Sequence, residues 1–324
     1  MSRRIWTLLI SLLLVVSVVA GCGGAAKETK PTQPAAEEKK VEAAAKPAAK
    51  TTVYPVTVKD AIGRDVVIPA EPKRILSVTP ANTELTFALG KGGSLVGRSD
   101  WCDYPEEAKK LPSIGGFQPQ PSYEKIVALQ PDLVLLTSGS DDARNKLISE
   151  YKLNVFVVSP QTFEDAYAGI KTLGVVLNAQ EAAEKLVADM QAAVKEVTDK
   201  VAKAASKPKV YYEVWDEPLM TAGTGTFIND MINLAGGVNV GAETKGWATI
   251  NAELVAKANP DIIIASSPMN LEKIQARTAW AGFKAVKDGK VLAVADANHV
   301  SRPGPRLVLG LKWFAQTLHP ELFK

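Results

Sequence analysis

The sequence predicts an α/β protein of two lobes, each built on a parallel sheet, with a single long helix joining them. Strand-like and helix-like segments alternate from residue 53 onward, a helical stretch interrupts the alternation mid-chain, and similar segments recur on either side of it. Such alternation is typical of parallel sheets, because parallel strands need a crossover connection. We therefore expect lobes at 53–178 and 207–324 and a connecting helix at 179–206.

The first lobe is expected to open with a hairpin that turns at Gly63, because residues 52–69 alternate apolar and polar side chains around that glycine. Strands and helices then follow in turn. Strands are expected at 75–78, 95–97, 133–137 and 155–158, and helices at 82–89 and 123–128.

After Phe163 the pattern becomes continuously helical. No glycine or proline interrupts 180–205, and apolar residues at helical spacing form one stripe there. At 1.5 Å per residue this helix would be about 40 Å long, the span of a small domain, so it can connect two lobes. The stripe consists of Leu186, Met190, Val194 and Val201.

The second half of the chain repeats the first. Residues 124–136 and 253–265 share a glutamate, an apolar helical segment, a Pro-Asp pair and an apolar strand at the same spacing. The segments before them also correspond: TELTFALG followed by SLVG matches FINDMINLAGG followed by VNVG. Two correspondences in the same order indicate that the two lobes have a similar construction.

The first residues predict export and anchoring. Arg3 and Arg4 precede an apolar run at 5–19 that ends in small residues before Cys22, as in a signal peptide. A cysteine at this place resembles the bacterial lipobox, whose thiol is lipidated. We expect a signal peptide at 1–21, and then a lipidated Cys22 that opens a disordered tether at 22–52.

The lipid would hold the protein on the extracytoplasmic side of a membrane in the cell envelope. A simple secretory signal with an incidental cysteine is the alternative. Once Cys22 is lipidated, Cys102 has no partner for an internal disulfide.

Composition and motifs exclude several classes of protein. Of the 324 residues, 46% are hydrophobic, and a formal net charge of +3 is too small and dispersed to indicate a nucleic-acid partner. The sequence has no GxSxG elbow, and TAGTGTF at 221–227 lacks the lysine of a phosphate-binding loop. We therefore expect no enzyme and no catalytic cofactor.

Candidate ligand contacts lie in loops that follow predicted strands. In α/β folds such loops hold ligands, and flat side chains there suit a large, flat or apolar molecule. Trp101, Phe117 and Trp247 stand among polar, glycine or proline neighbours and favour the cleft. Trp215, at a strand end, is as suited to packing as to binding.

The segment ILSVTPANTELTFALG at 75–90 predicts a strand, a polar elbow and a helix. At the end of a strand, this elbow is a candidate wall of the ligand site. Its residues are Thr79, Pro80, Ala81 and Asn82.

The last loop, NHVSRPGPR at 298–306, carries two arginines after a strand. Arg302 and Arg306 suit carboxylates, amides or phosphate, although Arg306 can instead open the last helix and pair at the surface. His299 is either an axial metal ligand or a polar loop residue. The only other histidine, His319, is expected at a capping or surface position, and two histidines are too few for a transition-metal receptor.

Glu124 and Glu253 occupy the first helical turn of each repeat, behind Ser122 and Asn251. A carboxylate is favoured there by about 0.3–1 kcal/mol, so a local role is sufficient. One glutamate on each lobe, in register, also forms a two-point charge pattern that a symmetric basic partner can recognise.

Four segments resemble the cobalamin-binding proteins of bacterial ABC importers, within the wider class that takes ferric siderophores and haem. They are ILSVTPANTELTFALG, SDWCDYPEEAKKLPSIGG, YEKIVALQPDLVLL and SRPGPR. The resemblance covers 53–324 and implies the class III periplasmic binding protein fold of the helical-backbone metal receptor type. It also implies a ligand cleft between the lobes and little hinge closure.

The resemblance implies that Trp101, Phe117 and Trp247 contact a corrin ring. It also implies that Glu124 and Glu253 meet arginines on an ABC importer permease dimer, which works with its ATPase. The expected ligand is vitamin B12 or cobinamide, and the expected binding protein is a monomer. The alternatives are haem or a ferric siderophore, and an extracellular enzyme that uses the interlobe cleft.

His299 departs from the family pattern, because relatives can carry an aromatic residue in this loop. An imidazole at this place could ligate cobalt or haem iron, so the ligand is less closely defined than the fold.

Overall fold

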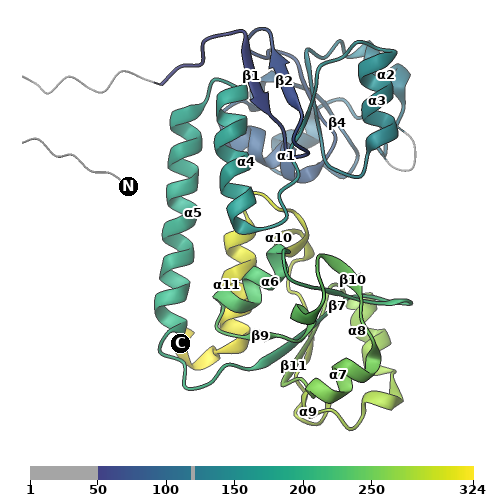
Figure 1. The fold of residues 1–324 in the computed structure, drawn as a ribbon, viewed down its shortest axis with the longest axis vertical. Helices are drawn as coiled ribbons and strands as arrows, with labels where there is room; N and C mark the ends of the chain where they lie inside the picture. The colour runs from purple at the N-terminus through teal and green to yellow at the C-terminus, as the bar shows by residue number, and fades with distance from the viewer. Residues whose placement is uncertain (1–49, 118–120) are drawn as a thin grey trace, which may run out of the picture. The chain divides into compact units, whose positions relative to one another are not determined.

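The computed structural model describes residues 50–117 and 121–324. These residues lie in one unit, Ala48–Lys324, and form two α/β lobes beside a pair of long helices (Figure 1). The expected signal peptide, the lipidated Cys22 and most of the tether lie outside the described residues. Within 50–117 and 121–324, no helix is both long and apolar enough to cross a membrane.

The N-terminal lobe contains a four-stranded parallel sheet with the order β4-β3-β5-β6. Side chains of β5 alternate between two apolar clusters, with Leu133 and Leu135 in one and Val134 and Leu136 in the other. Both faces of this strand are covered, which explains its unbroken apolar run. The strands are β3 Ile75–Ser77, β4 Leu95–Arg98, β5 Leu133–Leu136 and β6 Val155–Val157.

The predicted hairpin precedes this sheet. β1 Val56–Lys59 pairs with β2 Asp65–Ile68 in antiparallel register, and the turn between them contains Gly63 at φ +82°. Asp60 closes the turn, because its carboxylate accepts hydrogen bonds from the backbone N–H and the guanidinium of Arg64.

Within the described residues up to Val176, the chain also forms four α-helices and two 3₁₀ turns. α4 begins with a capping box, in which Thr162 and Asp165 each accept a backbone hydrogen bond from the other. The helices are α1 Pro80–Ala88, α2 Tyr123–Ala128, α3 Asp141–Ser149 and α4 Phe163–Val176, and the turns are η1 Gly92–Ser94 and η2 Glu106–Lys110.

Glu71 ties the loop before β3 to its surroundings. Its carboxylate forms ion pairs with Lys91 at 2.9 Å and Lys73 at 3.0 Å, and accepts a hydrogen bond from Asn178 at 3.4 Å. The hydrogen bonds from Lys91 and Lys73 lower the pKa of Glu71 to about 2.

The middle of the chain forms two antiparallel helices, so the uninterrupted helix predicted after Phe163 is wrong. The second of the two, Gln180–Val201, lies within the connecting helix predicted at 179–206. α4 is followed by a turn in which Asn178 takes φ +53°, and α5 then covers Gln180–Val201. Gly174 lets the two helices approach, since a Cβ there would lie 2.5 Å from the Cβ of Ala183. An asparagine in left-handed conformation breaks the helix where the sequence has neither glycine nor proline.

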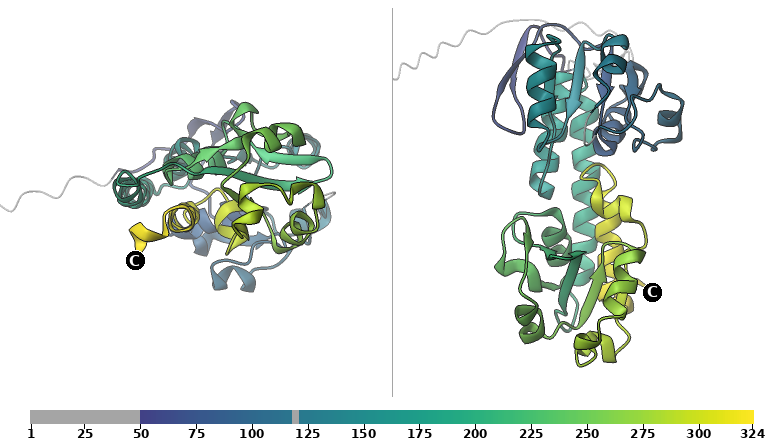
Figure 2. Two further views of the ribbon diagram at one scale, coloured as in Figure 1. Left: turned by 90° about the horizontal axis from the view of Figure 1, so that it is seen from below. Right: turned by 90° about the vertical axis from the view of Figure 1, so that its right-hand side faces the viewer.

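α5 runs past both lobes (Figure 2). It packs against α4 and against α11 Leu307–Leu318 of the C-terminal lobe. Its exposed side carries ion pairs one turn apart, among them Lys185–Asp189 and Lys195–Asp199. One amphipathic helix therefore belongs to the packing of both lobes.

The C-terminal lobe contains a six-stranded mixed sheet with the order β10-β8-β7-β11-β12, and β9 also pairs with β7. β9, β11 and β12 run parallel to β7, whereas β8 and β10 join as an antiparallel edge. The predicted fold class is confirmed, and the antiparallel edge is an addition that the prediction lacked. The strands are β7 Lys209–Asp216, β8 Leu219–Ala222, β9 Val238–Asn239, β10 Trp247–Thr249, β11 Ile262–Ala265 and β12 Val291–Ala293.

Helices of this lobe pack against its sheet. The helices of the lobe are α6 Phe227–Leu234, α7 Ala252–Ala258, α8 Pro268–Gln275, α9 Lys284–Lys287, α10 Ala297–Ser301 and α11, with 3₁₀ turns η3 Val240–Glu243, η4 Thr278–Trp280 and η5 Pro320–Phe323.

The internal repeat has a structural counterpart in the two lobes. α2 leads to β5 and α7 leads to β11, and each helix is followed by a residue of positive φ, Gln130 at 46° and Asn259 at 45°. The aspartate of each Pro-Asp pair then accepts a backbone hydrogen bond at the start of the neighbouring strand. Asp132 does so at 3.0 Å beside β3, and Asp261 at 2.8 Å on β7. The repeated aspartate thus joins equivalent strand pairs.

A buried ion pair connects β7 with the segment after α8. Glu213 is 0% exposed, and its carboxylate accepts two hydrogen bonds from the Arg277 guanidinium, at 2.8 and 2.9 Å. The guanidinium lies 4.1 Å from the ring centroid of Trp280. Burial raises the pKa of Glu213, against the opposing effect of Arg277.

His319 is the C-cap of α11, but it is buried rather than at the surface. Its imidazole Nε2 lies 3.4 Å from the carbonyl oxygen of Gly236, which follows α6. The surface alternative is therefore wrong, because the end of α11 packs against this turn.

Candidate ligand-binding cleft

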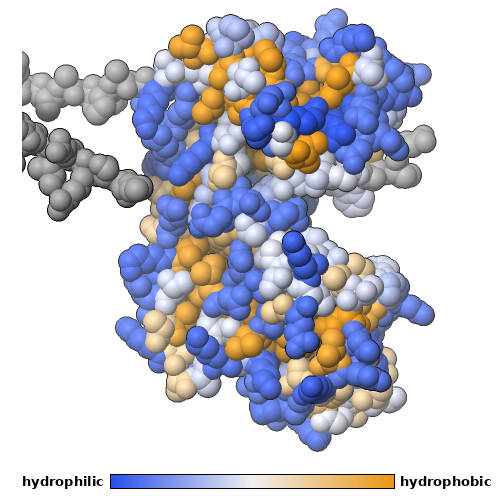
Figure 3. Space-filling model, viewed as in Figure 1, coloured by the Kyte–Doolittle hydropathy of each residue, from blue (hydrophilic) through white to orange (hydrophobic). Residues whose placement is uncertain are grey.

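A cavity of about 460 Å³ lies between the two lobes. In Figure 3 the molecule is narrower between its upper and lower parts, which are the two lobes. The N-terminal lobe contributes the carboxyl ends of β3, β5 and β6 and the first turn of α1, and the C-terminal lobe contributes α10 and the loop after it. Parallel strands present ligand sites at this edge. The lining residues are Val78, Thr79, Pro80, Ala81, Asn82, Trp101, Phe117, Thr137, Ser140, Val158, Ser159, Pro160, Asn298, Ser301, Arg302 and Pro303.

The elbow between β3 and α1 forms one wall, at the position expected from the sequence. α1 begins at Pro80, whose ring suits the first helical position, while Thr79 before it remains extended at φ −129°. Asn82 is buried, and its side-chain amide donates a hydrogen bond to the carbonyl oxygen of Leu136 at 3.0 Å. The wall is therefore fixed to the end of β5.

Hydroxyl groups form the floor where β5 and β6 end. The Thr137 hydroxyl donates to the Ser159 hydroxyl at 3.0 Å, and the hydroxyls of Ser138 and Ser159 are 2.7 Å apart. Such groups donate and accept hydrogen bonds without carrying charge. The floor suits a ligand with amide or hydroxyl groups.

Two of the four candidate aromatic residues line the cavity. Trp101 is 71% exposed, and Phe117 is buried at the end of the described segment 50–117. Because it contributes so little buried area to the fold, the Trp101 ring is available to a ligand.

The other two candidates lie outside the cavity. The indole N–H of Trp247 donates to Gln161 at 3.3 Å, next to Pro160 of the cavity wall, and its ring packs edge-to-face on Phe227. The indole N–H of Trp215 donates to a backbone carbonyl in its own hairpin, and Lys273 lies over its ring. Trp247 therefore flanks the cleft, and Trp215 packs locally at the end of β7.

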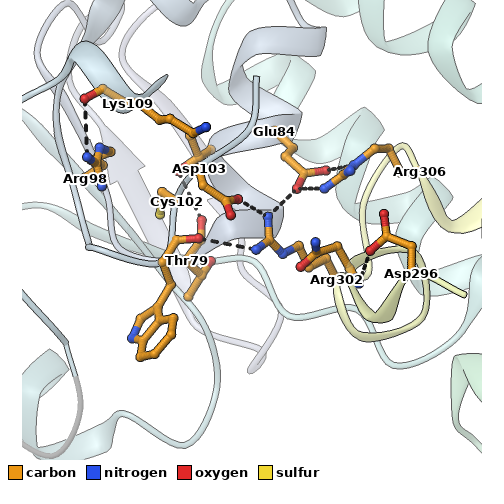
Figure 4. A network of polar contacts seen from close by, with 12 residues as sticks. Thr79, Glu84, Arg98, Cys102, Asp103, Lys109, Asp296, Arg302 and Arg306 are labelled. Carbon is orange, nitrogen blue, oxygen red and sulfur yellow. Dashed lines mark hydrogen bonds and ion pairs between the residues drawn. The ribbon is translucent and has the colours of Figure 1, made fainter. Parts of the chain in front are cut away.

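A network of two arginines and two carboxylates crosses from lobe to lobe beside the cavity (Figure 4). Arg302 donates to Glu84 at 3.1 Å, to Asp103 at 2.6 Å and to the carbonyl oxygen of Trp101 at 3.4 Å. Arg302 belongs to the C-terminal lobe and its three acceptors belong to the N-terminal lobe. The Arg302 guanidinium lowers the pKa of Asp103.

Arg306 completes the network from the start of α11. Its guanidinium donates two hydrogen bonds to Glu84, at 2.8 and 2.6 Å, and lies 4.1 Å from the ring centroid of Tyr104. Hydrogen bonding to Glu84 raises the pKa of Arg306. Both arginines are thus held as cations by the opposite lobe, and Arg306 both opens the last helix and forms a buried pair.

His299 lies on α10 but does not line the cavity. Its imidazole is 3.3 Å from the Asp296 carboxylate, and it borders a separate small cavity of about 40 Å³ against α11. Within the described part of the chain, no three His, Cys, Asp or Glu side chains are grouped as a metal site.

Glu124 and Glu253 occupy equivalent places in the first turns of α2 and α7, and both are exposed. Asn251 caps α7, since its side chain accepts a hydrogen bond from the Glu253 N–H at 2.8 Å, whereas the Ser122 side chain makes no such bond.

Sequence reasoning missed Glu84 and Asp103. Glu84 is 3% exposed although it is charged, and its partners Arg302 and Arg306 are 218 and 222 residues away. The one available signal was an acidic residue inside the otherwise apolar and neutral run ANTELTFALG. A buried charge needs a paired charge, but spacing along the chain does not identify the partner.

Two α/β lobes beside a long helix, with a ligand-sized cleft between them, define the class III periplasmic binding protein fold. The chain belongs to the periplasmic binding protein family, whose family model matches residues 75–297.

Three similar proteins make the class more specific. The chain is 35% identical over 97% of its length to an uncharacterized ABC transporter substrate-binding lipoprotein, YvrC, of Bacillus subtilis, and covers 97% of that protein. It is 29% identical over 77% of its length to a vitamin B12-binding protein of Pectobacterium carotovorum, and covers 89% of it. A crystal structure of a possible iron-binding, periplasmic solute-binding protein from Staphylococcus epidermidis matches with a TM-score of 0.70 and 30% identity, over 77% of this chain and all of that one. The protein is a substrate-binding protein of an ABC importer.

Proposed function

We propose that this protein captures a corrinoid, vitamin B12 or cobinamide, in the interlobe cleft and delivers it to an ABC importer permease. The observation that carries the proposal is the neutrality of the cleft. Among the described residues that line it, Arg302 is the charged one, and acceptors of the opposite lobe occupy its guanidinium.

A corrinoid matches this chemistry. Its macrocycle is flat and bears neutral amide side chains, which pair with hydroxyl and amide groups such as Thr137, Ser159 and Asn298. Trp101 and Phe117 offer aromatic surface to the ring. Trp247 beside the cavity wall is placed to extend that contact. The relative from Pectobacterium, a vitamin B12-binding protein, supports the same ligand class.

Haem or a ferric siderophore is the second candidate, and the possible iron-binding relative from Staphylococcus favours it. Haem carries two carboxylates and an iron that accepts an axial ligand, which is usually His, Cys, Met or Tyr. Within the described lining none of these four residue types occurs, and His299 faces Asp296. The lining therefore supports the corrinoid better. An enzyme that uses this cleft would need a nucleophile with an adjacent base, which the described lining does not offer.

Delivery requires docking and anchoring. Exposed Glu124 and Glu253, one on each lobe, are proposed to meet basic residues of a dimeric permease. Cys22 is proposed to carry the lipid that holds the protein at the membrane, in line with the lipoprotein name of the Bacillus relative.

Calorimetric titration of the purified protein with cyanocobalamin, dicyanocobinamide, haemin and a ferric hydroxamate tests the proposal. We expect sub-micromolar binding of a corrinoid that Trp101→Ala weakens by about tenfold or more, equal to at least about 1.4 kcal/mol. The exposed Trp215→Ala, away from the cavity, is the matched control and should leave affinity unchanged. Binding of haemin or the iron chelate without binding of either corrinoid would refute the ligand assignment.

A further inference from the structure

We propose that Glu84 is a specificity-determining residue, which neutralises two arginines at the cleft and thereby makes the site reject anionic ligands. This inference rests on the proposed function in one respect, that the cleft takes a neutral macrocycle. It adds a residue with a defined task, and it predicts which ligands are refused.

Glu84 is placed to act on both arginines at once. Its Oε1 accepts from Arg302 at 3.1 Å and from Arg306 at 2.6 Å, and its Oε2 accepts from Arg306 at 2.8 Å (Figure 4). The carboxylate is almost fully buried, while Arg302 forms part of the cavity wall. The negative charge therefore lies behind the cationic wall, where a ligand does not displace it.

The charge count shows why this matters. Arg302 and Arg306 are balanced by Glu84 and Asp103, so the network as a whole is neutral. Without the Glu84 charge, Asp103 would be the one carboxylate left in the network for two guanidinium groups, and it pairs with Arg302. Arg306 would keep its stacking on Tyr104 but lose its anionic partner. Such a group is the preferred partner of carboxylates and phosphates.

A structural role alone predicts a different result. Glu84 also links the two lobes, so a mere loss of this link would weaken every ligand in parallel. A specificity role changes the ratio between anionic and neutral ligands of similar shape. The ratio is therefore the quantity to measure.

The experiment compares wild type and Glu84→Gln in the full chain, with dicyanocobinamide as the neutral probe and two anionic probes. The anionic probes are dicyanocobyrinic acid, in which carboxylates replace the peripheral amides of the same macrocycle, and haemin. Asp103→Asn is the second variant, because the half-exposed Asp103 side chain tolerates replacement and the change removes one of the two carboxylates that pair with Arg302. Glu106→Gln, an exposed carboxylate paired with Lys109 in the same lobe, is the matched control for loss of one negative charge.

We expect Glu84→Gln to improve affinity for the anionic probes relative to dicyanocobinamide by about tenfold or more, equal to at least about 1.4 kcal/mol. Asp103→Asn should shift the ratio in the same direction by less, and Glu106→Gln should not shift it. An unchanged ratio in Glu84→Gln, including equal weakening of all probes, overturns the inference. If Glu84→Gln does not fold, an unchanged ratio in Asp103→Asn overturns it. If wild type binds no corrinoid while Glu84→Gln still gains haemin affinity, the corrinoid proposal fails and the role of Glu84 stands.

Discussion

Replacing Arg277 by methionine tests how the fold supports a buried charge on β7. Removing one partner of a buried ion pair typically costs about 3–5 kcal/mol, because the remaining charge is left unpaired. Glu213 is 0% exposed, so water cannot replace the two hydrogen bonds that Arg277 donates. We expect Arg277→Met to lower the free energy of unfolding at pH 7 by about 3–5 kcal/mol.

Replacing the other partner of the ion pair, as in Glu213→Gln, is expected to cost less. The Arg277 side chain is 23% exposed and lies on Trp280, so after Glu213→Gln it can still reach solvent and keep its stacking. The amide oxygen of glutamine also still accepts a hydrogen bond. We expect a loss of about 1–2 kcal/mol for this variant, typical of a weakened hydrogen bond to a charged group.

The pH dependence of the Arg277→Met variant follows from the raised pKa of Glu213. Burial raises this pKa above the ordinary 4.5, and the Arg277→Met change removes the guanidinium whose hydrogen bonds and charge oppose the rise. The native state then binds a proton at a pH where the unfolded chain does not, so stability increases as pH falls toward 4.5. The deficit of the variant relative to wild type should therefore shrink between pH 7 and pH 5.

Urea unfolding followed by circular dichroism at pH 7 and pH 5 measures the stability loss of each variant and the change of the Arg277→Met deficit with pH. The reasoning would be refuted if Arg277→Met cost no more than Glu213→Gln, or if its deficit grew at pH 5. Either result would mean that water or another group reaches the Glu213 carboxylate in the variant.

Three further predictions concern docking, acid stability and helix packing. Alanine at both Glu124 and Glu253 should abolish uptake by cells while calorimetric affinity for the ligand stays unchanged; a parallel loss of affinity would contradict the docking role. Glu71, with a pKa lowered to about 2, should add stability that is present above about pH 4.5 and is lost as pH falls toward 2. Glu71→Gln should therefore remove that part of the pH dependence of urea unfolding, and an identical pH profile in wild type and variant would disprove it. Gly174→Val should lower the free energy of unfolding by about 1–3 kcal/mol or more, because its Cβ would meet Ala183 at 2.5 Å; unchanged thermal unfolding would show that α4 and α5 separate freely.

The fold was predictable where the apolar pattern is local and repeated. The strands β5 and β11 are short unbroken apolar runs, and the repeated Pro-Asp pair marks the same turn in both lobes. The break between α4 and α5 was not predictable from glycine or proline, because Asn178 makes the turn. The β8–β10 edge was missed because both strands are short and they pair across α6 and β9, which lie between them in the sequence.

Some residues of the cleft were predictable from the sequence and others were not. The elbow at Thr79–Asn82 was predictable, because a strand end followed by a proline-initiated helix has one geometry. The direction of His299 was not, since α10 turns the imidazole toward Asp296 rather than into the cavity. Glu84 was not either, because its identity as an interlobe partner depends on two arginines more than 200 residues away.

The bridge between Glu84 and the two arginines also affects how a transporter handles empty receptors. Protein atoms alone make this bridge, and α5 packs against elements of both lobes, so the protein holds its two lobes together without cargo. We expect a permease that recognises Glu124 and Glu253 to meet nearly the same surface on loaded and empty copies. Empty copies would occupy docking sites in competition with loaded ones, and uptake would pass through a maximum and then decline as the amount of binding protein exceeds the supply of ligand.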